Sequence, residues 1–460
     1  MAATKPNIIL INCDDLGYGD LGCYASDCND TPFIDKLAAD GLRFTDFYVS
    51  SPVCSASRAS LMTGCYSQRV GFGPYQVLFP GQQQGLNPKE STIAKQLKEV
   101  GYNTKLIGKW HCGDQPEFLP TSHGFDEYFG IPYSNDMGRQ AGGIENQVPL
   151  PLLRNKEVIQ QQPDQRGITE RYVDESLQFM RANAEQPFFL YLAHMYVHVP
   201  LFIPEQFLKV SRNGAYGGAV ACIDWALGAI ENELDRLGLK DNTLLIFTSD
   251  NGSRTHGEGG SNDPLRGTKG QTWEGGQRVP CIMRWPGKIE AGTTCEGIAT
   301  SIDLFATLAE ITDAPLPENK IDSISLVETM LEGKETKRDT FAYYKGTALD
   351  AVRKGDWKLH FCKTGWTKEK ADDIHELYNL RDDVGETTNL YESHPDIVKE
   401  LNDVAEEFRA TLGDSQTDRE GSEIREVGFI ENAKPLTEYD EDHPYMVAYY
   451  DLADMPTMSG

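Results

Sequence analysis

The chain alternates short apolar runs with amphipathic segments, and this alternation limits its fold more than any other feature of the sequence. The apolar runs have the length of buried strands, and the segments between them include amphipathic helices with capping residues and C-terminal glycines. The runs lie at residues 7–12, 103–111, 187–200 and 243–252, and the helices at residues 31–41, 91–101 and 219–238. Strands that alternate with helices predict a mostly parallel, doubly wound α/β sheet.

The last part of the chain, from about Lys345 on, has a different texture. The stretches ALDAVRKGDWKLHF and HELYNLRDDVGETTNL are short and strand-like, and the helical pattern PDIVKELNDVAEEFRATLG follows them. This order favours a small antiparallel sheet with one helix. At 460 residues the chain also exceeds the usual size of a single-core domain. We therefore predict a large α/β domain at residues 1–345 and a small α+β domain at residues 346–460, with an acidic tail from Asp414 on.

The chain is strongly acidic, and this charge argues against two classes of partner. It has 43 Lys and Arg residues against 70 Asp and Glu residues, for a net charge of −27. Such a surface repels phosphate backbones and anionic membranes, so we expect neither nucleic acid nor a membrane as partner. It also repels an anionic substrate, so a binding site for an anion would need its own local cluster of cations.

The ten cysteines are scattered along the chain and form no short metal-ligand pairs. Several stand in apolar contexts such as ILINC and VPCIM, where a reduced cysteine behaves as a small buried hydrophobic residue. No apolar run reaches the about 20 residues of a membrane span, and the first residues lead directly into a strand. We expect a protein of the reducing cytoplasm; a periplasmic or secreted protein whose signal peptide had been removed would leave the same sequence.

Four residues that can bind a metal ion follow two of the predicted strands. Asp14 and Asp15 come after the first strand, and Asp250 and Asn251 come at the end of a late one. Each pair alone is an ordinary turn former. Because ligand sites of open α/β sheets lie at the carboxyl ends of the strands, we expect the two pairs to meet there. Three carboxylates and an amide oxygen then form an all-oxygen site suited to Ca²⁺ or Mg²⁺.

Potential cations end other segments of the same predicted sheet. Lys109 and His111 are two residues apart, so that both side chains would point the same way on an extended segment. The other three candidates are Arg58, His198 and Lys269. Five such groups around one point would bind a tetrahedral anion. His194, in contrast, is interpreted as a core histidine.

Cys54 stands at the start of the stretch PVCSASRASLMTG, with Arg58 four residues later. A cysteine near a helix N-terminus has its thiol pKa lowered by the helix dipole, and Arg58 would lie on the same helical face. The residues leave three interpretations open: a thiolate nucleophile, a site of covalent modification, or a buried structural cysteine. Since a thiolate is an unusual companion of hard oxygen ligands, the pattern suggests that the cysteine is not the final functional group.

The stretch CSASRASLMTG resembles the signature of the type I sulfatases, in which a maturase oxidises the cysteine to Cα-formylglycine. Further stretches resemble the same family in its order: GKWH, GFDEYFGIPYSND, VHVP, TSDNG, LRGTKGQTWEGGQRVPCIMRWPGKI and ELYNLRDDVGETTNL. The resemblance covers nearly the whole chain. It implies an alkaline-phosphatase-like α/β domain with a small C-terminal α+β domain, and hydrolysis of sulfate esters.

The resemblance also implies a role for each residue of the predicted site. The implied metal ligands for one divalent ion, normally Ca²⁺ rather than Mg²⁺, are Asp14, Asp15, Asp250, Asn251 and the modified Cys54. Arg58 would hold the formylglycine. The implied sulfate ligands are Lys109, His111, His198 and Lys269, with Ser134 nearby. A hydroxyl of the hydrated formylglycine would attack sulfur, His198 with Lys269 would assist the leaving oxygen, and His111 would take the proton when sulfate is expelled.

One position departs from the common pattern of the family. Ala56 stands where proline is commonest, and this form resembles substrates of the radical, oxygen-independent maturases. We therefore expect a maturase of that type as partner.

Two other functions remain open at this level. A phosphomonoester, phosphodiester or phosphonate hydrolase of the same superfamily would use a similar anion site, and an unmodified protein could bind sulfated glycans without catalysis. Specificity is expected from loops at residues 74–87 and 135–165, including Asp136 and Arg139. Sulfated sugars, glycosaminoglycan fragments, and aryl or steroid sulfates all fit; the acidic surface favours short or singly sulfated molecules.

Overall fold

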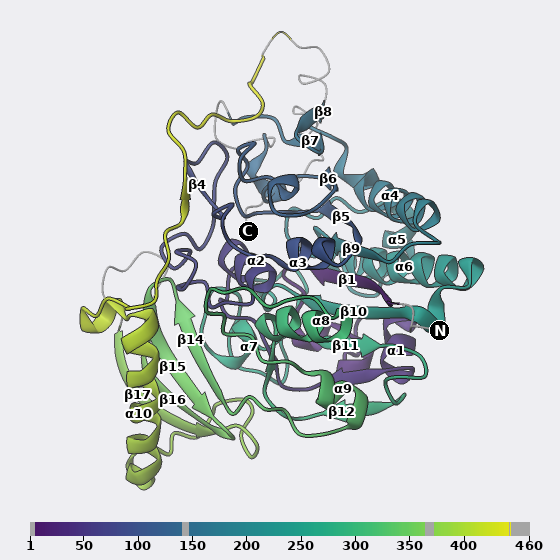
Figure 1. Ribbon diagram of the computed structural model, residues 1–460. Helices are drawn as coiled ribbons and strands as arrows, with labels where there is room; N and C mark the ends of the chain where they lie inside the picture. Colours follow the sequence, from purple (N-terminus) through teal and green to yellow (C-terminus); the bar gives the residue numbers. More distant parts are fainter. Residues whose placement is uncertain (1–4, 140–146, 364–371, 441, 443–460) are drawn as a thin grey trace.

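The fold is a large twisted sheet with helices on both faces and a second, smaller sheet at one side (Figure 1). The computed structural model describes residues 5–139, 147–363, 372–440 and 442. The strands of the large sheet are β1 (Asn7–Cys13), β2 (Leu42–Phe44), β5 (Asn103–Gly108), β6 (Glu127–Gly130), β7 (Pro151–Arg154), β8 (Glu157–Gln161), β9 (Phe188–Ala193), β10 (Thr243–Ser249), β11 (Cys281–Arg284) and β12 (Thr293–Cys295).

The centre of the large sheet is parallel, as the alternation of strands and helices predicts. The strand order is β12-β2-β11-β10-β1-β9-β5-β6-β7-β8, and the strands from β10 to β6 in this order run in one direction. The antiparallel pairs lie towards the two edges, between β10, β11 and β2 and between β6, β7 and β8. The predicted fold class, a mostly parallel α/β sheet with a separate small antiparallel sheet, is confirmed.

Strand β1 shows why the sheet is covered on both faces. Ile8 and Leu10 belong to one hydrophobic cluster, and Ile9 and Ile11 to another, because successive side chains of a strand point to opposite faces. The first cluster includes residues of α2 (Cys54–Thr63), α3 (Ile93–Glu99), α8 (Leu304–Thr312) and α9 (Val327–Glu332). The second includes residues of α1 (Pro32–Ala39), α4 (Ile168–Ala182) and α6 (Gly214–Leu237).

Two predicted strands end earlier than expected. β5 ends at Gly108 and β9 at Ala193, so Lys109, His111 and His198 stand on the loops that follow and not on the strands. His111 has a φ of 60°, in the left-handed region, so the segment is not extended there. The expectation that Lys109 and His111 stand on an extended segment is therefore wrong, and the alternation of side chains in a strand does not apply to them.

The smaller sheet is antiparallel and consists of β14 (Thr340–Lys345), β15 (Ala348–Lys354), β16 (Trp357–Lys363) and β17 (Asp372–Asn379). The whole of its first strand, β14, lies before the predicted domain boundary at 345/346. Helix α10 (Pro395–Leu412) packs on β15 and β16.

The chain after α10 turns back along the large sheet (Figure 1, yellow). Its strand β18 (Gly428–Phe429) pairs with β4 (Gln84–Gly85). Within the predicted acidic tail, residues 441 and 443–460 lie outside the described residues.

All ten cysteines are free thiols, and Cys23 and Cys28 are the two that are not buried. This agrees with the interpretation of most of them as small buried hydrophobic residues. In the part of the chain that the structure describes, no helix combines the length and the apolar character needed to cross a membrane.

Helix α1 receives its N-terminal cap from another helix. The side chain of Thr31, the residue before the helix, makes no capping hydrogen bond. Instead, Asp224 Oδ1 on α6 accepts hydrogen bonds from the backbone N–H groups of Phe33 at 2.9 Å and Ile34 at 2.8 Å. A carboxylate from 190 residues away thus satisfies two of the N–H groups that the first turn of an α-helix leaves without a partner.

The Asp224 cap gives a prediction for stability. Asp224→Ala leaves two buried or half-buried N–H groups without an acceptor and is expected to lower the free energy of unfolding by about 1–2 kcal/mol. Chemical denaturation of the variant and of Asp224→Asn, which keeps an acceptor oxygen and should lose less, measures the effect. Equal stability of Asp224→Ala and the wild type would show that the cap contributes nothing.

Candidate active site

The two acidic pairs meet at the carboxyl ends of β1 and β10, as predicted. The strands are parallel neighbours with Cys13 opposite Ser249, so the residues that follow them lie side by side. The N–H of Asp15 donates to Asp250 Oδ1 at 3.2 Å, and Asn251 Nδ2 donates to Asp15 Oδ1 at 2.7 Å. The four side chains are almost completely buried, which holds their oxygen atoms in one small polar space.

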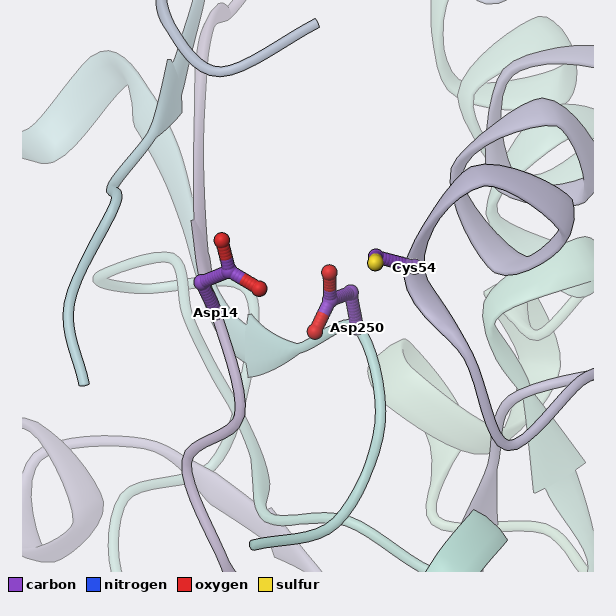
Figure 2. A group of neighbouring side chains, drawn as sticks. All are labelled: Asp14, Cys54 and Asp250. Atoms are coloured by element: carbon purple, nitrogen blue, oxygen red, sulfur yellow. The ribbon is translucent and has the colours of Figure 1, made fainter. Parts of the chain in front are cut away.

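Cys54 reaches this space from a different element. It is the first residue of α2, a helix whose ten residues are all buried. Its Sγ, an oxygen of Asp14 and an oxygen of Asp250 lie within 4.8 Å of one another. Figure 2 shows the three side chains converging from the ends of β1 and β10 and from the start of α2. A group at position 54 can therefore act on whatever these carboxylates hold.

Arg58, one helical turn after Cys54, connects α2 to both carboxylates. Its Nε donates to Asp250 Oδ2 at 2.8 Å, its Nη2 lies 2.7 Å from the same oxygen, and Nη2 lies 3.7 Å from Asp14 Oδ1. Its Nη1 donates to the carbonyl of Lys109 at 3.0 Å. The guanidinium is 1% exposed and thus acts as a fixed internal counter-ion.

The expectation of a lowered thiol pKa at Cys54 is wrong. Burial raises the pKa of this thiol, and the charges of Lys109 and Lys269 offset only part of the effect. The helix N-terminus is present, but the removal of the sulfur from water outweighs it. An unmodified Cys54 is therefore a protonated thiol at neutral pH, which argues against the interpretation as a thiolate nucleophile.

Two lysines pair with the first acidic pair. Lys109 Nζ lies 2.6 Å from Asp14 Oδ2 and donates to Ser134 Oγ at 3.2 Å, while Lys269 Nζ lies 2.9 Å from Asp15 Oδ2. Burial opposes ionisation, but Lys109 and Arg58 hold the pKa of Asp14 well below its usual range. The carboxylates raise the pKa of Lys109 and of Lys269 against the same opposing burial. Both lysines are therefore cations.

His198 is fixed by Asn135 and Ser134, which come from one loop. Its Nδ1 lies 3.0 Å from Asn135 Oδ1 and 2.5 Å from the carbonyl of Val199, and both are acceptors. Nδ1 therefore carries a proton, and Nε2 faces Ser134 Oγ at 3.2 Å and Asp15 Oδ2 at 3.9 Å. Burial lowers the pKa of His198, so its imidazole is neutral and offers the Nε2 lone pair to the site.

His111 is held by the loop that contains Leu78. Its Nε2 lies 3.0 Å from the carbonyl of Leu78, which requires Nε2 to carry the proton. Its Nδ1 is buried and has no partner. Burial, together with Lys109 and Arg58, lowers the pKa of His111 well below its ordinary value. The neutral ring can therefore accept a proton or a hydrogen bond at Nδ1.

The site holds both carboxylates that can bind a divalent cation and cations that can bind an anion. Asp14, Asp15 and Asp250 face Arg58, Lys109 and Lys269, all of them buried. Burial raises the pKa of Asp250 to about 6, and the negative charge of Asp14 acts in the same direction. The positive charge of Arg58 offsets only part of this rise. Asp14 Oδ1 and Asn251 Oδ1 are buried without a hydrogen-bond partner. Unpaired oxygens beside a carboxylate that resists ionisation fit a hard cation such as Ca²⁺ or Mg²⁺.

The structure brings all the predicted site residues into this one region. They are Asp14, Asp15, Cys54, Arg58, Lys109, His111, Ser134, His198, Asp250, Asn251 and Lys269. His194 lies apart, as expected of a core residue, since its Nδ1 accepts the N–H of Tyr196 at 3.0 Å. Sequence reasoning missed Asn135 and the carbonyl of Leu78. Asn135 directly follows Ser134 and could have been found there, whereas no sequence signal marks a carbonyl.

Two family models match the chain and together cover most of it. The model described as Sulfatase matches residues 6–314, and the model described as C-terminal region of aryl-sulfatase matches residues 336–427. The first covers the large sheet and every residue of the site, and the second covers the four-stranded sheet and α10.

Individual relatives agree with the family models. Arylsulfatase A of Homo sapiens is 40% identical over 426 residues, which are 84% of this chain and 84% of that protein. N-acetylgalactosamine-6-sulfatase of Rattus norvegicus is 37% identical over 394 residues, which are 80% of this chain and 72% of that protein. The crystal structure of Ps i-CgsB in complex with k-i-k-neocarrahexaose has a TM-score of 0.79 and 30% identity, covering 90% of this chain and 94% of that chain.

Proposed function

Because the chain belongs to the type I sulfatase family of the alkaline phosphatase superfamily, we propose that it hydrolyses sulfate esters with a formylglycine made from Cys54 and a bound divalent metal ion. Sulfate-ester hydrolysis itself follows from the family. The observation that carries the finer proposal is the position of Cys54, whose side chain faces the carboxylates of Asp14 and Asp250 although burial keeps its thiol protonated.

The proposed metal ligands are the oxygen atoms of Asp14, Asp15, Asp250 and Asn251, with the group at position 54 as a further ligand. The unpaired Oδ1 atoms of Asp14 and Asn251 support this assignment. When bound, the ion supplies Lewis-acid stabilisation of negative charge on the sulfate oxygens. Ca²⁺ is the proposed ion because the donors are several carboxylate and amide oxygens of the protein, whereas Mg²⁺ usually keeps much of its water shell.

The formylglycine explains why a cysteine with a high thiol pKa stands at this position. One hydroxyl of its hydrate would lose its proton with help from Asp250 and attack sulfur as the bond to the alcohol oxygen breaks. The second hydroxyl would then lose its proton, so that the C–O bond to sulfate breaks and the aldehyde re-forms. Arg58 fixes the carboxylates beside it. The neutral His111 has an unpaired buried Nδ1 that can take the proton of the second hydroxyl.

The cations bind the sulfate group and assist the leaving oxygen. Lys109 and Ser134 are proposed to hold the sulfuryl oxygens, since Lys109 already donates to Ser134. His198, which also contacts Ser134, joins them once its Nε2 is protonated. Lys269 is charged and lies next to Asp15 at the same edge. We assign to it the stabilisation of the alcohol oxygen as the S–O bond breaks, joined by His198 once the charge of the bound sulfate has raised the pKa of the imidazole and Nε2 carries a proton.

Short aryl sulfates or singly sulfated sugars are the proposed substrates. Leu78 is fixed at the site, because its N–H donates to Ser55 Oγ at 3.0 Å and its carbonyl contacts His111. The next residue, Phe79, is 61% exposed, and we assign to its ring a contact with the group that carries the sulfate. The predicted loop at 135–165 adds Arg139, whose guanidinium lies 4.0 Å from the centre of the Tyr439 ring; residues 140–146 of that loop lie outside the described residues.

Relatives that act on or bind sugars support the sugar part of this substrate range. N-acetylgalactosamine-6-sulfatase is a sugar sulfatase by name, and Ps i-CgsB was solved with a carrageenan-type hexaose. The net charge of −27 favours short ligands of low charge.

Maturation by a radical, oxygen-independent maturase in the cytoplasm is proposed from Ala56 and from the cysteines. Ala56, two residues after Cys54, is 1% exposed and stands at the position where the family usually has proline. The absence of a disulfide among the ten cysteines, all of which the structure describes, fits a reducing compartment.

The modification of Cys54 is tested by mass and by activity. In protein from its native host, the peptide that contains Cys54 should be lighter than the thiol form by about 18 Da, because oxygen replaces sulfur and two hydrogens are lost. Cys54→Ala should release no sulfate from aryl sulfates while keeping its denaturation midpoint. A thiol mass, or full activity of Cys54→Ala, would contradict the proposal.

The metal site is tested by thermal unfolding of protein stripped of metal. Ca²⁺ should raise Tm in the wild type more than Mg²⁺ does, because the ion binds the folded state only. Asp250→Asn removes a ligand charge and should lose most of this shift, whereas the exposed Asp241→Asn should keep it. An equal Ca²⁺ shift in both variants would place the ion elsewhere.

The role of Phe79 is tested with a substrate panel of aryl sulfates, singly sulfated sugars and matched phosphate monoesters. Phe79→Ala should lower kcat/KM for its best sulfate ester about 3- to 10-fold, mainly through KM, since an aromatic contact is worth about 0.5–1.5 kcal/mol and is present in ground and transition states alike. Phe33→Ala, an exposed aromatic on α1, serves as control. Preference for the phosphate esters would favour the rival phosphohydrolase function.

A further inference from the structure

We propose that Lys345, a residue of the C-terminal sheet, is a positioning residue that holds Lys269 in the active site through the peptide of Gly270. The inference rests on the proposed role of Lys269 at the leaving oxygen. It concerns a residue outside the site described above, from a strand that contributes no side chain to the acidic pairs.

The start of the loop at residues 268–274 is hydrogen-bonded to the large α/β unit. The hydroxyl of Thr268 donates to the carbonyl of Ser253 at 2.8 Å, and the N–H of Lys269 donates to the same carbonyl at 3.0 Å. The N–H of Gly270 donates to the carbonyl of Pro52 at 2.9 Å. Pro52 is two residues before Cys54, so this loop and the start of α2 share a hydrogen bond.

Two residues of this loop, Gly270 and Thr272, are also hydrogen-bonded to the C-terminal sheet. The ammonium of Lys345, at the end of β14, donates to the carbonyl of Gly270. Asp350 Oδ2 on β15 accepts from the hydroxyl of Thr272 at 2.9 Å, and Lys358 Nζ on β16 donates to the carbonyl of Thr272 at 2.9 Å. Three neighbouring strands thus hold a loop that contains one of the site's cations.

Among these contacts with the C-terminal sheet, the one made by Lys345 lies nearest to Lys269 along the chain. The carbonyl of Gly270, the residue after Lys269, accepts from Lys345, while the N–H of Gly270 donates to the carbonyl of Pro52. Lys345 is 2% exposed, and burial lowers its pKa to about 8. A long cationic side chain in such surroundings is retained at a cost in desolvation, which is consistent with a specific positioning role.

Loss of this contact has a distinct kinetic consequence. Without Lys345 the carbonyl of Gly270 loses its donor, and the loop that carries Lys269 is free to shift while the ion pair with Asp15 remains. A displaced Lys269 stabilises the leaving oxygen less well, and poor leaving groups need that stabilisation most. A purely structural role of Lys345 would slow all substrates by the same factor.

The experiment uses the full-length, matured and metal-loaded enzyme and a series of aryl sulfates with leaving groups of different pKa. Lys345→Met should lower kcat/KM about 10- to 100-fold for the poorest leaving groups and less than about 3-fold for the best, in kcat more than in KM. Lys345→Arg, which keeps a donor, should recover part of the loss. Lys345→Gln provides a second neutral variant should the methionine variant fold poorly.

Tyr344→Phe is the matched control. Tyr344 precedes Lys345 on β14, is buried, and donates to the carbonyl of Gly413 at 2.9 Å, away from the loop. Its loss destabilises the same sheet, yet the dependence on the leaving group should stay that of the wild type. Hydrogen exchange adds a readout without turnover: the amide of Gly270 should exchange at least 10-fold faster in Lys345→Met and unchanged in Tyr344→Phe.

The outcomes separate this inference from the proposed function. Lys269→Ala should show the strongest dependence on the leaving group. If it shows none, the proposed role of Lys269 fails, and faster exchange at Gly270 in Lys345→Met still supports the positioning. If Lys269→Ala behaves as expected while Lys345→Met loses activity equally for all leaving groups, or keeps normal exchange at Gly270, the positioning role of Lys345 is overturned.

Discussion

The structure depends on a set of opposite charges that are buried together at the ends of β1 and β10. Asp14, Asp15 and Asp250 are matched by Arg58, Lys109 and Lys269, and each of these side chains is at most 8% exposed. Removing a charge from water costs several kcal/mol, so none of the six is tolerated in the interior without its partners. Their common position requires parallel strands that end at the same level and a helix that presents Arg58 from the other side.

This requirement explains the sequence around Cys54. Helix α2 must lie deep in the protein for Arg58 to reach both carboxylates, and its small residues Ser55, Ala56, Ser57 and Ala59 permit that depth. The same depth removes Cys54 from water and makes its thiol a poor nucleophile. A formylglycine at this position has no such limitation, since its hydrate does not depend on a thiolate. The two structural units then meet at the loop at 268–274, through which the small sheet can influence the site.

Much of the site could be predicted from the sequence, because residues at the carboxyl ends of parallel strands converge regardless of their distance along the chain. The pairing of Asp14 and Asp15 with Asp250 and Asn251 follows from that rule. Details that depend on loops could not: the strand before His198 ends early, and His111 has a left-handed backbone. Their positions depend on contacts with Asn135 and with the carbonyl of Leu78.

The limits of sequence reasoning are clearest at Cys54 and Lys345. A helix start predicts a lowered thiol pKa for Cys54, but the depth of burial, which only the packed structure gives, reverses the sign. Lys345 belongs to a strand with an ordinary pattern and reaches the site through a backbone carbonyl, so no motif marks it. The strands β1, β5, β9 and β10 at the centre of the large sheet, the small sheet and α10, in contrast, follow from local periodicity.

The central claim is that a group at position 54, held among these charges, attacks the sulfur atom of a sulfate ester. Hydrolysis of an aryl sulfate by the matured enzyme in oxygen-18 water tests it most directly, with mass analysis of both products. The account predicts solvent oxygen in the released sulfate and none in the phenol, because the S–O bond breaks and the hydrate exchanges with water. Label in the phenol, or absence of label from the sulfate, would contradict attack at sulfur.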